Sequence, residues 1–460
     1  MYKRYQSIHF VGIGGAGMSG IAEVLHTLGY KVTGSDMKAS ANTSRLSEMG
    51  IRIDIGHRAG NIKDAQVLVI SSAVSPGNPE VKEALLQGVP VIPRAEMLAE
   101  IGRLKYSVLV AGSHGKTTTT SLVATAVARA GLDPTVVIGG RLNALGANAR
   151  HGKGEFLVAE ADESDGSFLK LSPTIAIVTN IDREHMEYFK TMHALEGAFL
   201  EFLNKVPFYG LNVVCVEDSH LAGMIPDLKR RVLKYGFGES ADLRAVEIEK
   251  GFMSVGYTVL LRGRELFRLN LPLPGDHNVL NSLAAIGAAL ELDIEPMAVK
   301  QALEGFQGIG RRLELKGEAK GIRVYDDYGH HPTEIKATIK SLRDGFPSGG
   351  AARIFVLFQP HRYTRTRDLM EEFATSFGAT DRLLLMDIYA AGEQPIEGID
   401  SGALFKRLSK HIDGRATYVK DRDEAMNTLE KELRQGDVLL TLGAGDVWKI
   451  SEQMVERLSK

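Results

Sequence analysis

The stretch Val108-Leu109-Val110-Ala111-Gly112-Ser113-His114-Gly115-Lys116-Thr117-Thr118 decides how the rest of the sequence is interpreted. Its apolar start predicts a buried strand, its glycines predict a tight turn, and the residues from Lys116 to Ala130 predict a helix. The backbone N–H groups at such a strand-to-helix turn bind phosphate well, because the helix dipole adds to their attraction for an anion. The sequence therefore predicts a phosphate-binding loop.

The side chains of this loop indicate which phosphate compound it binds. Lys116 is expected to place its positive charge on the β- and γ-phosphates of ATP, and the Thr117 hydroxyl to bind Mg²⁺. The usual pattern G-x-x-x-x-G-K-T has a glycine where this chain has Val110, so the loop is a shortened variant. The predicted nucleotide-binding residues, with their backbone N–H groups around the phosphates, are Gly112, Ser113, His114, Gly115, Lys116, Thr117 and Thr118.

A second glycine-rich turn stands near the start of the chain, in His9-Phe10-Val11-Gly12-Ile13-Gly14-Gly15-Ala16-Gly17. It follows a predicted strand at 8–11 and precedes a predicted helix at 16–28, the context in which such a turn holds a diphosphate. We expect Gly12, Gly14, Gly15 and Gly17 to do so, and Asp36, at the end of the next strand, to accept a hydrogen bond from a ribose. The pattern leaves the nucleotide open, and a nicotinamide-dependent oxidoreductase is one alternative.

The composition narrows the classes of function. The chain has 460 residues with a formal net charge of −2, which argues against binding nucleic acid or an anionic membrane in bulk. The sequence has neither a signal peptide nor an apolar run of 18 residues, so we expect a cytoplasmic protein. Its single cysteine, Cys215, excludes an internal disulfide and is expected to be a small buried apolar side chain.

Strand-like and helix-like segments alternate over most of the chain, which predicts an α/β fold in three domains. We expect a Rossmann-like N-terminal domain at 1–103, a central P-loop ATPase-type domain at 104–312, and a Rossmann-like C-terminal domain at 313–460. Short strands at 212–216, 254–261 and 266–271 predict an antiparallel patch in the central domain.

Two side chains are candidates to complete a metal site with Thr117. Glu160 and His185 each follow a predicted strand of the central domain. Ligands gather at the carboxyl ends of parallel strands, and Mg²⁺ keeps several waters, so few protein ligands are needed. We therefore predict that Thr117, Glu160 and His185 bind Mg²⁺.

Taken together, these motifs resemble the Mur ligase family over residues 8–450. The resemblance rests on the order and spacing of eight segments: 9–20, 112–118, 160–168, 179–185, 276–282, 310–313, 326–334 and 359–366. It implies a UDP-binding domain, an ATPase domain and a domain that brings an amino acid. It also implies an ATP-dependent reaction that joins a carboxylate to an amine through an acyl phosphate.

The resemblance assigns further roles by position. It places Ser71, Ser72 and Asp36 near the uridine, and Asn278 and Asn281 on the adenine side of ATP. It implies that Arg312 reaches the nucleotide from a domain junction and that Asp327 lies near the γ-phosphate and ribose.

The segment Gln359-Pro360-His361-Arg362-Tyr363-Thr364-Arg365-Thr366 is the candidate for binding the amino acid. Arginine can bind a carboxylate through two parallel hydrogen bonds, so Arg362 and Arg365 are expected to hold the carboxylate of the incoming residue. His361 and Tyr328 are expected to line the pocket. The predicted catalytic residues are Lys116, His185, His361, Arg362 and Arg365, and His330, His331 and His361 remain alternatives for the base that deprotonates the amine.

One feature indicates which branch of the family this chain resembles. Many relatives carry a carbamylated lysine in the helix after the metal histidine, whereas here Lys205 comes late in that helix. This matches the branch that adds L-alanine to UDP-N-acetylmuramate, with ATP and Mg²⁺, acting as monomer or homodimer in cell-wall synthesis. A ligase for another amino acid or a preformed peptide, and a non-catalytic ATP binder, are the alternatives.

Overall fold

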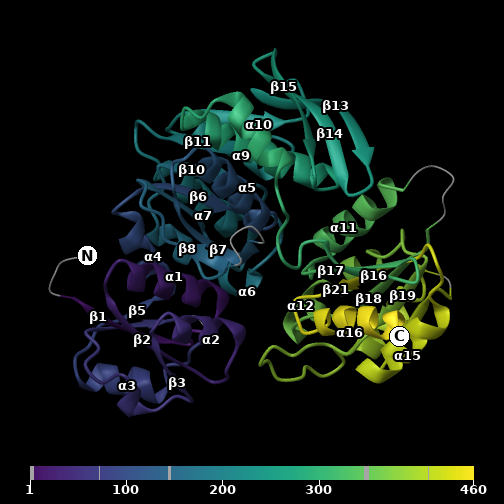
Figure 1. The fold of residues 1–460 in the computed structure, drawn as a ribbon, viewed down its shortest axis with the longest axis horizontal. Coiled ribbons are helices and arrows are strands. Elements are labelled where there is room, and N and C mark those ends of the chain that lie inside the picture. The colour runs from purple at the N-terminus through teal and green to yellow at the C-terminus, as the bar shows by residue number, and fades with distance from the viewer. Residues whose placement is uncertain (1–4, 72, 143–146, 347–351, 413) are drawn as a thin grey trace. The chain divides into compact units, whose positions relative to one another are not determined.

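The computed structural model describes residues 5–71, 73–142, 147–346, 352–412 and 414–460. The chain forms two compact units. One contains Met1–Ile248, Tyr257–Leu269 and Asn278–Gln307, and the other contains Glu249–Gly256, Asn270–His277 and Gly308–Lys460. Three β-sheets with covering helices confirm the predicted α/β fold (Figure 1).

The first sheet has five parallel strands in the order β3-β2-β1-β4-β5. Because β2 and β4 flank β1 on opposite sides, the turns after β1 and β4 open at the point where the strand order reverses, the usual ligand position in such sheets. Its elements are β1 (Ser7–Val11), α1 (Ala16–Thr27), β2 (Lys31–Asp36), α2 (Ala41–Glu48), β3 (Arg52–Ile55), η1 (Ala59–Asn61), β4 (Val67–Ile70), α3 (Pro79–Leu86), β5 (Val91–Pro93) and α4 (Arg94–Gly102).

The second sheet has ten strands in the order β15-β14-β13-β12-β11-β10-β6-β9-β7-β8. At its centre β6 lies between β10 and β9, parallel to both. These strands are buried apolar runs, as expected where helices cover both faces of a parallel sheet. The strands are β6 (Tyr106–Ala111), β7 (Thr135–Leu142), β8 (Ala147–Arg150), β9 (Phe156–Glu160), β10 (Ile175–Val178), β11 (Leu211–Cys215), β12 (Val232–Gly236), β13 (Leu243–Gly251), β14 (Ser254–Leu261) and β15 (Arg264–Leu271).

Helices and single turns connect these strands. They are α5 (Lys116–Arg129), η2 (Ser167–Lys170), α6 (Met186–Phe189), α7 (Met192–Asn204), α8 (Ser219–Met224), η3 (Ile225–Asp227), α9 (Asp276–Glu291) and α10 (Pro296–Glu304).

The predicted antiparallel patch needs one correction. Two-residue turns join β13 to β14 and β14 to β15, and such turns connect antiparallel neighbours. The predicted strand at 212–216, observed as β11, instead pairs in parallel with β10 and β12. The prediction for this strand was wrong because close spacing along the chain was taken as a sign of hairpins, whereas α8 makes the crossover from β11 to β12.

The third sheet has six strands in the order β16-β17-β21-β18-β19-β20, and only β16 is antiparallel among the pairings described. The side chains of β18 alternate between two cores: Val356 and Phe358 pack with α11, α13 and α14, while Phe355 and Leu357 pack with α15 and α16. The elements are β16 (Glu314–Ala319), β17 (Ile322–Asp327), α11 (Pro332–Asp344), β18 (Ile354–Phe358), α12 (Tyr363–Asp368), α13 (Met370–Ala374), β19 (Arg382–Leu385), α14 (Ser401–Leu408), β20 (Ala416–Tyr418), α15 (Arg422–Glu432), β21 (Val438–Leu442) and α16 (Trp448–Ser459).

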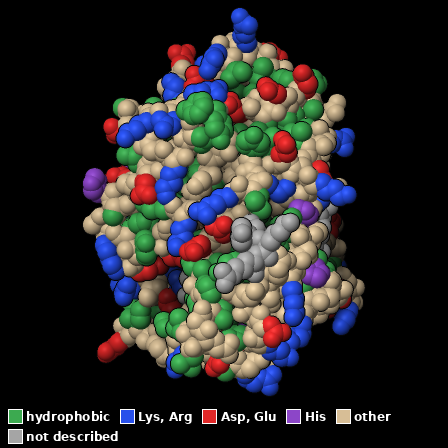
Figure 2. Space-filling view, turned by 90° about the vertical axis from the view of Figure 1, so that its left-hand side faces the viewer, with side chains coloured by type: hydrophobic (Ala, Val, Ile, Leu, Met, Phe, Trp, Pro, Cys, Tyr) green, Lys and Arg blue, Asp and Glu red, His purple; other side chains and the backbone are tan. Residues whose placement is uncertain are grey.

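The distribution of charged side chains on the surface agrees with the small net charge of the chain. Figure 2 shows basic and acidic side chains interspersed on the face in view, in keeping with the small net charge. Among the described residues, the structure contains no helix of the length and apolar character that a membrane span requires. Cys215 is buried, as predicted.

A buried carboxylate organises the first sheet. Glu80, at the start of α3, accepts hydrogen bonds from the Ser35 hydroxyl at 2.6 Å and from the Asn61 amide at 2.5 Å, and its Oε2 lies 3.5 Å from His9 Nε2. Burial alone would raise the pKa of Glu80, but these partners outweigh it and lower the pKa to about 2. The charged carboxylate is thus part of the fold of the first domain.

Replacing Glu80 with glutamine tests this network. The pKa of Glu80 in the folded protein lies below the ordinary value of 4.5, so its charge stabilises the fold above about pH 4.5 and this contribution is lost as the pH falls towards 2. The shift corresponds to about 3 kcal/mol at most. We expect Glu80→Gln to lower the free energy of unfolding by about 1–3 kcal/mol at pH 7, and by much less at pH 3, in urea titrations followed by circular dichroism. Glu83→Gln, on the same helix, is the matched control, and a loss independent of pH would contradict the assignment.

Candidate active site

Three loops meet at one edge of the central sheet. They follow β6, β9 and β10, which are parallel neighbours, so their carboxyl ends lie side by side. The loop after β6 is the predicted phosphate loop, the loop after β9 carries the acidic segment Asp162-Glu163, and the loop after β10 runs from Thr179 to His185. The topology therefore brings together segments about 70 residues apart.

The phosphate loop depends on glycine at two positions. Gly112 and Gly115 have φ angles of +125° and +81°, which disfavour any other residue. A Cβ atom on Gly112 would lie 2.2 Å from the Thr179 hydroxyl oxygen, and one on Gly115 would lie 2.5 Å from Asn281 Oδ1. Neighbouring segments thus approach the loop so closely that only hydrogen fits there.

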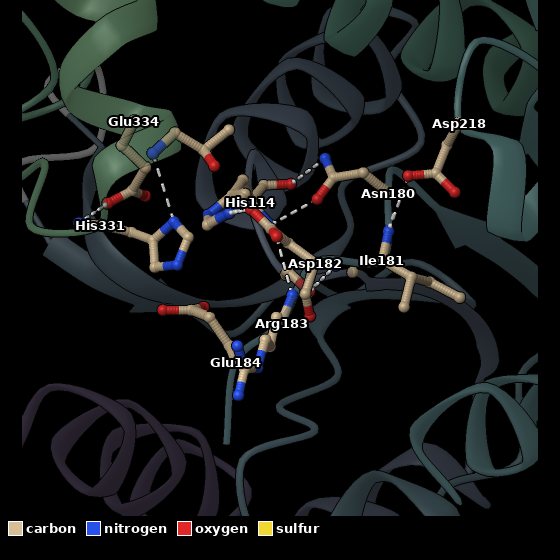
Figure 3. Close-up of polar contacts among 12 residues, drawn as sticks. His114, Asn180, Ile181, Asp182, Arg183, Glu184, Asp218, His331 and Glu334 are labelled. Carbon is tan, nitrogen blue, oxygen red and sulfur yellow. Dashed lines mark hydrogen bonds and ion pairs between the residues drawn. The ribbon is translucent and has the colours of Figure 1, made fainter. Parts of the chain in front are cut away.

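Asn180 and its neighbours hold the loop in this shape (Figure 3). The side chain of Asn180 accepts a hydrogen bond from the backbone N–H of His114 at 2.9 Å and donates to the carbonyl of the same residue at 3.0 Å. The Thr179 hydroxyl donates to that carbonyl at 2.6 Å, and His114 Nε2 lies 2.8 Å from Asp182 Oδ2. We call Thr179, Asn180 and Asp182 the clamp. Ile181 N–H donates to Asp218 at 3.1 Å, which anchors the clamp to the start of α8.

These contacts reduce the number of backbone N–H groups in the loop that are available to bind phosphate. The N–H groups of Ser113 and His114 both donate to Asn180, so the protein itself uses two of the N–H groups predicted to surround the phosphates. The first N–H groups of a helix have no partner within the helix, and here they belong to Lys116, Thr117 and Thr118. The start of α5 is the part of the loop best suited to an anion.

Lys116 forms a buried ion pair at this helix start. Its Nζ donates to Glu163 Oε1 at 2.8 Å and to the carbonyls of Gly112 and Ser113 at 2.5 and 3.2 Å. Burial opposes a charged lysine, but Glu163 and Asp162 outweigh it and raise the pKa of Lys116. Lys116 is therefore a cation fixed inside the loop, as its predicted role requires.

His185 lies beside this ion pair, close to Glu163. His185 Nε2 is 3.7 Å from Glu163 Oε1 and 3.9 Å from Glu184 Oε2. Glu160, at the end of β9, accepts a hydrogen bond from the backbone N–H of Gly139 at 2.8 Å. The metal role of Glu160 stays a prediction, whereas Glu163 and Glu184 are site residues that the sequence analysis missed.

Asn281 on α9 contacts the phosphate loop directly. Its Oδ1 accepts from the Thr119 hydroxyl at 3.2 Å, and its Nδ2 donates to Asn278 Oδ1 at 3.2 Å. Both asparagines are buried. The predicted role near adenine is untested, but Asn281 clearly supports the turn at Gly115.

The N-terminal glycine turn uses its own N–H groups in a similar way. Gly12 and Ile13 donate to the Ser35 carbonyl, and Gly15 donates to the Gly12 carbonyl. Gly14 donates to Asp36 Oδ2 at 2.8 Å, so Asp36 holds the turn. The start of α1, at Ala16–Met18, therefore holds the N–H groups available for the predicted diphosphate, whose binding there stays a prediction.

Two further groups lie near this turn. A Cβ on Gly12 would lie 3.7 Å from the Ser71 hydroxyl, and one on Gly17 would lie 2.7 Å from the guanidinium of Arg94. Arg94 also donates to Asp162 Oδ2 at 3.1 Å, which links the first domain to the acidic loop after β9. Ser72 lies outside the described residues.

In the second unit, Asp327 fixes the chain around the start of the third sheet. Its carboxylate accepts from the backbone N–H groups of Leu313 and Gly329, both at 2.7 Å. Burial outweighs the opposing effects of Arg312 and these hydrogen bonds, and raises the pKa of Asp327 to about 6. Arg312 lies 3.5 Å from Glu334 and over the ring of Tyr328.

The predicted amino-acid segment gathers His361, Arg362 and Arg365 with Tyr389. The ring of His361 stacks on Tyr389 with an interplanar angle of 8°, and Arg365 Nη1 lies 3.3 Å from His361 Nδ1. Arg362 has φ +72° and donates its N–H to the Tyr389 carbonyl at 2.9 Å, and its guanidinium lies 3.5 Å from Glu393. The structure thus brings the three predicted residues together and adds Tyr389, which the sequence analysis missed.

The histidines near this segment differ in what they can do. Burial is the main cause that lowers the pKa of His361 to about 3, with nearby His330 and the arginines adding to it, so its ring is neutral. His331 Nδ1 accepts from Thr333 N–H at 3.3 Å, which places the proton of the neutral ring on Nε2. His330 Nδ1 lies 3.1 Å from the Tyr328 carbonyl, which can only accept, so Nε2 of His330 is the nitrogen able to take up a proton.

Comparison with known proteins identifies the family. Residues 7–106 match the Mur ligase family, catalytic domain; residues 110–289 match the Mur ligase middle domain; and residues 311–445 match the Mur ligase, glutamate ligase domain.

The chain belongs to the Mur ligase family.

Relatives in the Mur ligase family match this chain end to end. The UDP-N-acetylmuramate–L-alanine ligase of Geobacter sp. (strain M21) is 54% identical over 100% of this chain and 99% of its own length. The same-named ligase of Geobacter sulfurreducens is 50% identical, with the same coverage. The crystal structure of UDP-N-acetylmuramate-alanine ligase from Thermotoga maritima has a TM-score of 0.84 at 29% identity and covers 98% of both chains.

A more distant Mur ligase shares the fold and carries a nucleotide. The MurF ligase of Thermotoga maritima, in complex with ADP, has a TM-score of 0.62 at 16% identity, over 93% of this chain and 95% of that chain. Mur ligases use ATP, and the donors of the loop after β6 fit a triphosphate. Glu163, Glu184 and His185 offer one ligand atom each within 4.8 Å of one another, and carboxylate oxygens are the ligands that Mg²⁺ prefers. The residues present therefore fit both ATP and a divalent cation.

Asn180→Ala tests whether the hydrogen bonds from Asn180 hold the phosphate loop in the shape that binds ATP. The substitution removes two hydrogen bonds to His114, and we expect the affinity for a non-hydrolysable ATP analogue to fall about tenfold, measured by calorimetry. Asn204→Ala, which removes an amide that bonds only to the backbone near α7 and η3, is the matched control. Equal affinities in both variants would show that the loop keeps its shape without the clamp.

Proposed function

We propose that this chain forms the amide bond between L-alanine and the lactyl carboxylate of UDP-N-acetylmuramate, with ATP converted to ADP and phosphate, in peptidoglycan precursor synthesis. The end-to-end identity of 50–54% to ligases with this name carries the proposal. The charged Lys116 in the loop after β6 supports the ATP-dependent step. We place the activity in the cytoplasm, where ATP and nucleotide sugars are found.

The first step is the attack of the lactyl carboxylate on the γ-phosphate of ATP, which yields an acyl phosphate and ADP. Two like charges about 4 Å apart repel by about 1 kcal/mol in water and about 4 kcal/mol at an effective dielectric of 20. Lys116 offsets this repulsion and takes up charge in the transition state, and the start of α5 adds backbone donors. A bound Mg²⁺ would supply further positive charge on the phosphates; Thr117, Glu160 and His185 remain the predicted ligands.

The UDP-sugar is proposed to bind at the first sheet. The start of α1 would hold the diphosphate, with Gly12, Gly14, Gly15 and Gly17 allowing close approach. Arg94 lies against Gly17 and pairs with Asp162, next to Glu163, which lies beside Lys116. This chain of contacts runs from the proposed diphosphate site to the phosphate loop and supports binding of the two nucleotides in one reaction.

The second step is the attack of the alanine amine on the acyl carbon, with phosphate as the leaving group. Arg362 and Arg365 are proposed to hold the alanine carboxylate, with His361 and Tyr328 in the pocket wall. A ring with a pKa near 3 is a weak proton acceptor, so His361 is a binding residue in this scheme. His330, whose Nε2 can accept, is proposed to take the proton of the amine.

Release of ADP from the purified protein tests the function directly. With UDP-N-acetylmuramate and ATP present, we expect sustained ADP release only when L-alanine is added. A panel with glycine, D-glutamate and a tripeptide measures selectivity. Turnover at least tenfold faster with any of these than with L-alanine would overturn the substrate assignment and favour a ligase for another amino acid or a preformed peptide.

Arg362→Ala and Arg365→Ala test the amino-acid site. Each removes charged donors from the proposed carboxylate site, so the KM for L-alanine should rise by about 10- to 100-fold while the KM for ATP changes less than threefold. Arg367→Ala is the matched control on the same helix, because Arg367 is exposed and pairs with Asp368. Equal effects on both KM values would place Arg362 and Arg365 outside the alanine pocket.

A further inference from the structure

The loop after β19 holds the segment 359–366, to which the alanine carboxylate is proposed to bind. The pairing of β18 with β19 continues past both strands: Tyr389 N–H donates to the Pro360 carbonyl at 2.8 Å, and the Tyr389 carbonyl accepts from Arg362 N–H at 2.9 Å. The ring of Tyr389 stacks on His361, and a Cβ atom on Gly445 would lie 2.8 Å from Tyr389 Cγ. Both the backbone and the ring of Tyr389 are therefore fixed against this segment.

Arg362 adopts a backbone conformation that favours glycine. Its φ of +72° and ψ of +137° lie in a region that residues with a Cβ atom rarely adopt. Contacts on both sides maintain it, because the N–H of Arg362 donates to Tyr389 and its carbonyl accepts from the N–H and the hydroxyl of Thr366 at 3.2 and 2.9 Å. Backbone strain of this kind gathers at functional sites, where the surrounding structure sets the direction of a side chain.

Glu393, four residues after Tyr389, places a carboxylate beside Arg362. Its Oε2 accepts from the backbone N–H of Thr364 at 3.0 Å, and its Oε1 accepts from the Thr364 hydroxyl at 2.6 Å. A tight turn leads to it, in which Glu393 N–H donates to the Ala390 carbonyl at 3.0 Å. Because Thr364 holds both oxygens, the position of the carboxylate does not depend on Arg362.

The ion pair between these residues is partly exposed. Arg362 Nε lies 3.5 Å from Glu393 Oε1, and the two side chains are 42% and 20% exposed. An ion pair in contact with water adds little to the stability of a fold. A long side chain, however, loses rotamer freedom when it binds a ligand, and a partner that restricts it beforehand reduces this loss. The value of the pair therefore lies in placing the guanidinium of Arg362.

The same carboxylate fixes the start of α12. The first N–H groups of a helix have no partner within it, and Glu393 accepts from one of them, that of Thr364. The helix carries Arg365, whose Nη1 lies 3.3 Å from His361 Nδ1. Glu393 thus joins Arg362, which precedes α12, to the helix that carries the second arginine.

We propose that Glu393 is a positioning residue of the amino-acid site, which holds the guanidinium of Arg362 in place for the carboxylate of the incoming amino acid. The inference rests on the proposed function and deepens it, because Glu393 acts through Arg362. A guanidinium has five N–H donors in one plane, so an arginine that faces one carboxylate through Nε can bind a second carboxylate through its other edge.

A double-mutant cycle tests whether Glu393 acts through Arg362. Glu393→Gln removes the charge and keeps an oxygen that can accept from Thr364. We expect the KM for L-alanine to rise about three- to tenfold and the KM for ATP to change less than twofold. In the Arg362→Ala background the same substitution should raise the KM for L-alanine less than twofold, because the partner is already absent. An equal rise in both backgrounds, or no rise in the unaltered one, would overturn the proposal.

The matched control is Glu397→Gln. Glu397 is an exposed residue of the same loop, so the substitution removes the same charge without touching the segment 359–366. The KM for L-alanine in this variant should stay within twofold of the unaltered chain. A rise equal to that of Glu393→Gln would attribute the effect to the net charge of the loop and overturn the positioning role.

A measurement without substrate reports on the guanidinium itself. In the full-length protein labelled at its arginine Nε atoms, NMR gives the rate at which each Nε–H exchanges with water, and the Arg362 signal is identified by its loss in Arg362→Ala. We expect Glu393→Gln to speed this exchange at least fivefold. An unchanged rate would contradict the positioning role, whereas absence of the ligase reaction would contradict only the proposed function.

A second variant covers the case in which Glu393→Gln does not fold. Thr364→Val keeps the shape of the side chain and removes the hydroxyl that anchors Glu393 Oε1. The KM for L-alanine should then rise about two- to fivefold, with faster exchange of the Arg362 Nε–H. Unchanged values of both would overturn the proposal.

Discussion

The two hydrogen bonds between the side chain of Asn180 and the backbone of His114 are the constraint on which the site depends. They fix a loop whose glycines adopt backbone angles that few other residues tolerate, and one of them occupies the backbone N–H of His114. As a result, the first turn of α5 and the ammonium of Lys116 form the surface that we propose binds the phosphates of ATP. The shape of the phosphate loop thus depends on the loop after β10, which follows it by about 65 residues along the chain.

In the first sheet, too, the protein itself accepts hydrogen bonds from the N–H groups of a glycine-rich turn. There Asp36 and Ser35 accept hydrogen bonds from N–H groups of the glycine turn, and the start of α1 is the proposed site for a diphosphate. In both turns the glycines permit close approach, while the helix that follows offers the donors. Arg94 and Asp162 connect the two places through one ion pair. The two proposed nucleotide sites therefore share one design, a glycine-rich turn before a helix, and charged side chains link them. This arrangement suits a reaction that needs two nucleotides.

The sequence predicted the parts of the fold that local patterns determine. Buried apolar runs and glycine turns gave β1, α1, β6 and α5 to within about two residues, and the alternation of strands and helices gave the fold class. The direction of β11 was missed, because strand pairing depends on where α8 returns the chain. Glu163 was missed because it lies three residues beyond a strand end, in a turn whose side-chain directions follow no period. Likewise, the differing roles of His330, His331 and His361 depend on which atoms their rings meet, and spacing along the chain does not contain that information.

The most direct test of this account is a crystal structure with a non-hydrolysable ATP analogue and UDP-N-acetylmuramate bound together. The account predicts the triphosphate at the start of α5 against Lys116, with Ser113 and His114 still bonded to Asn180, and the diphosphate of the sugar nucleotide at the start of α1. A triphosphate bound at α1, or a loop after β6 that opens its bonds to Asn180 to receive the nucleotide, would contradict it.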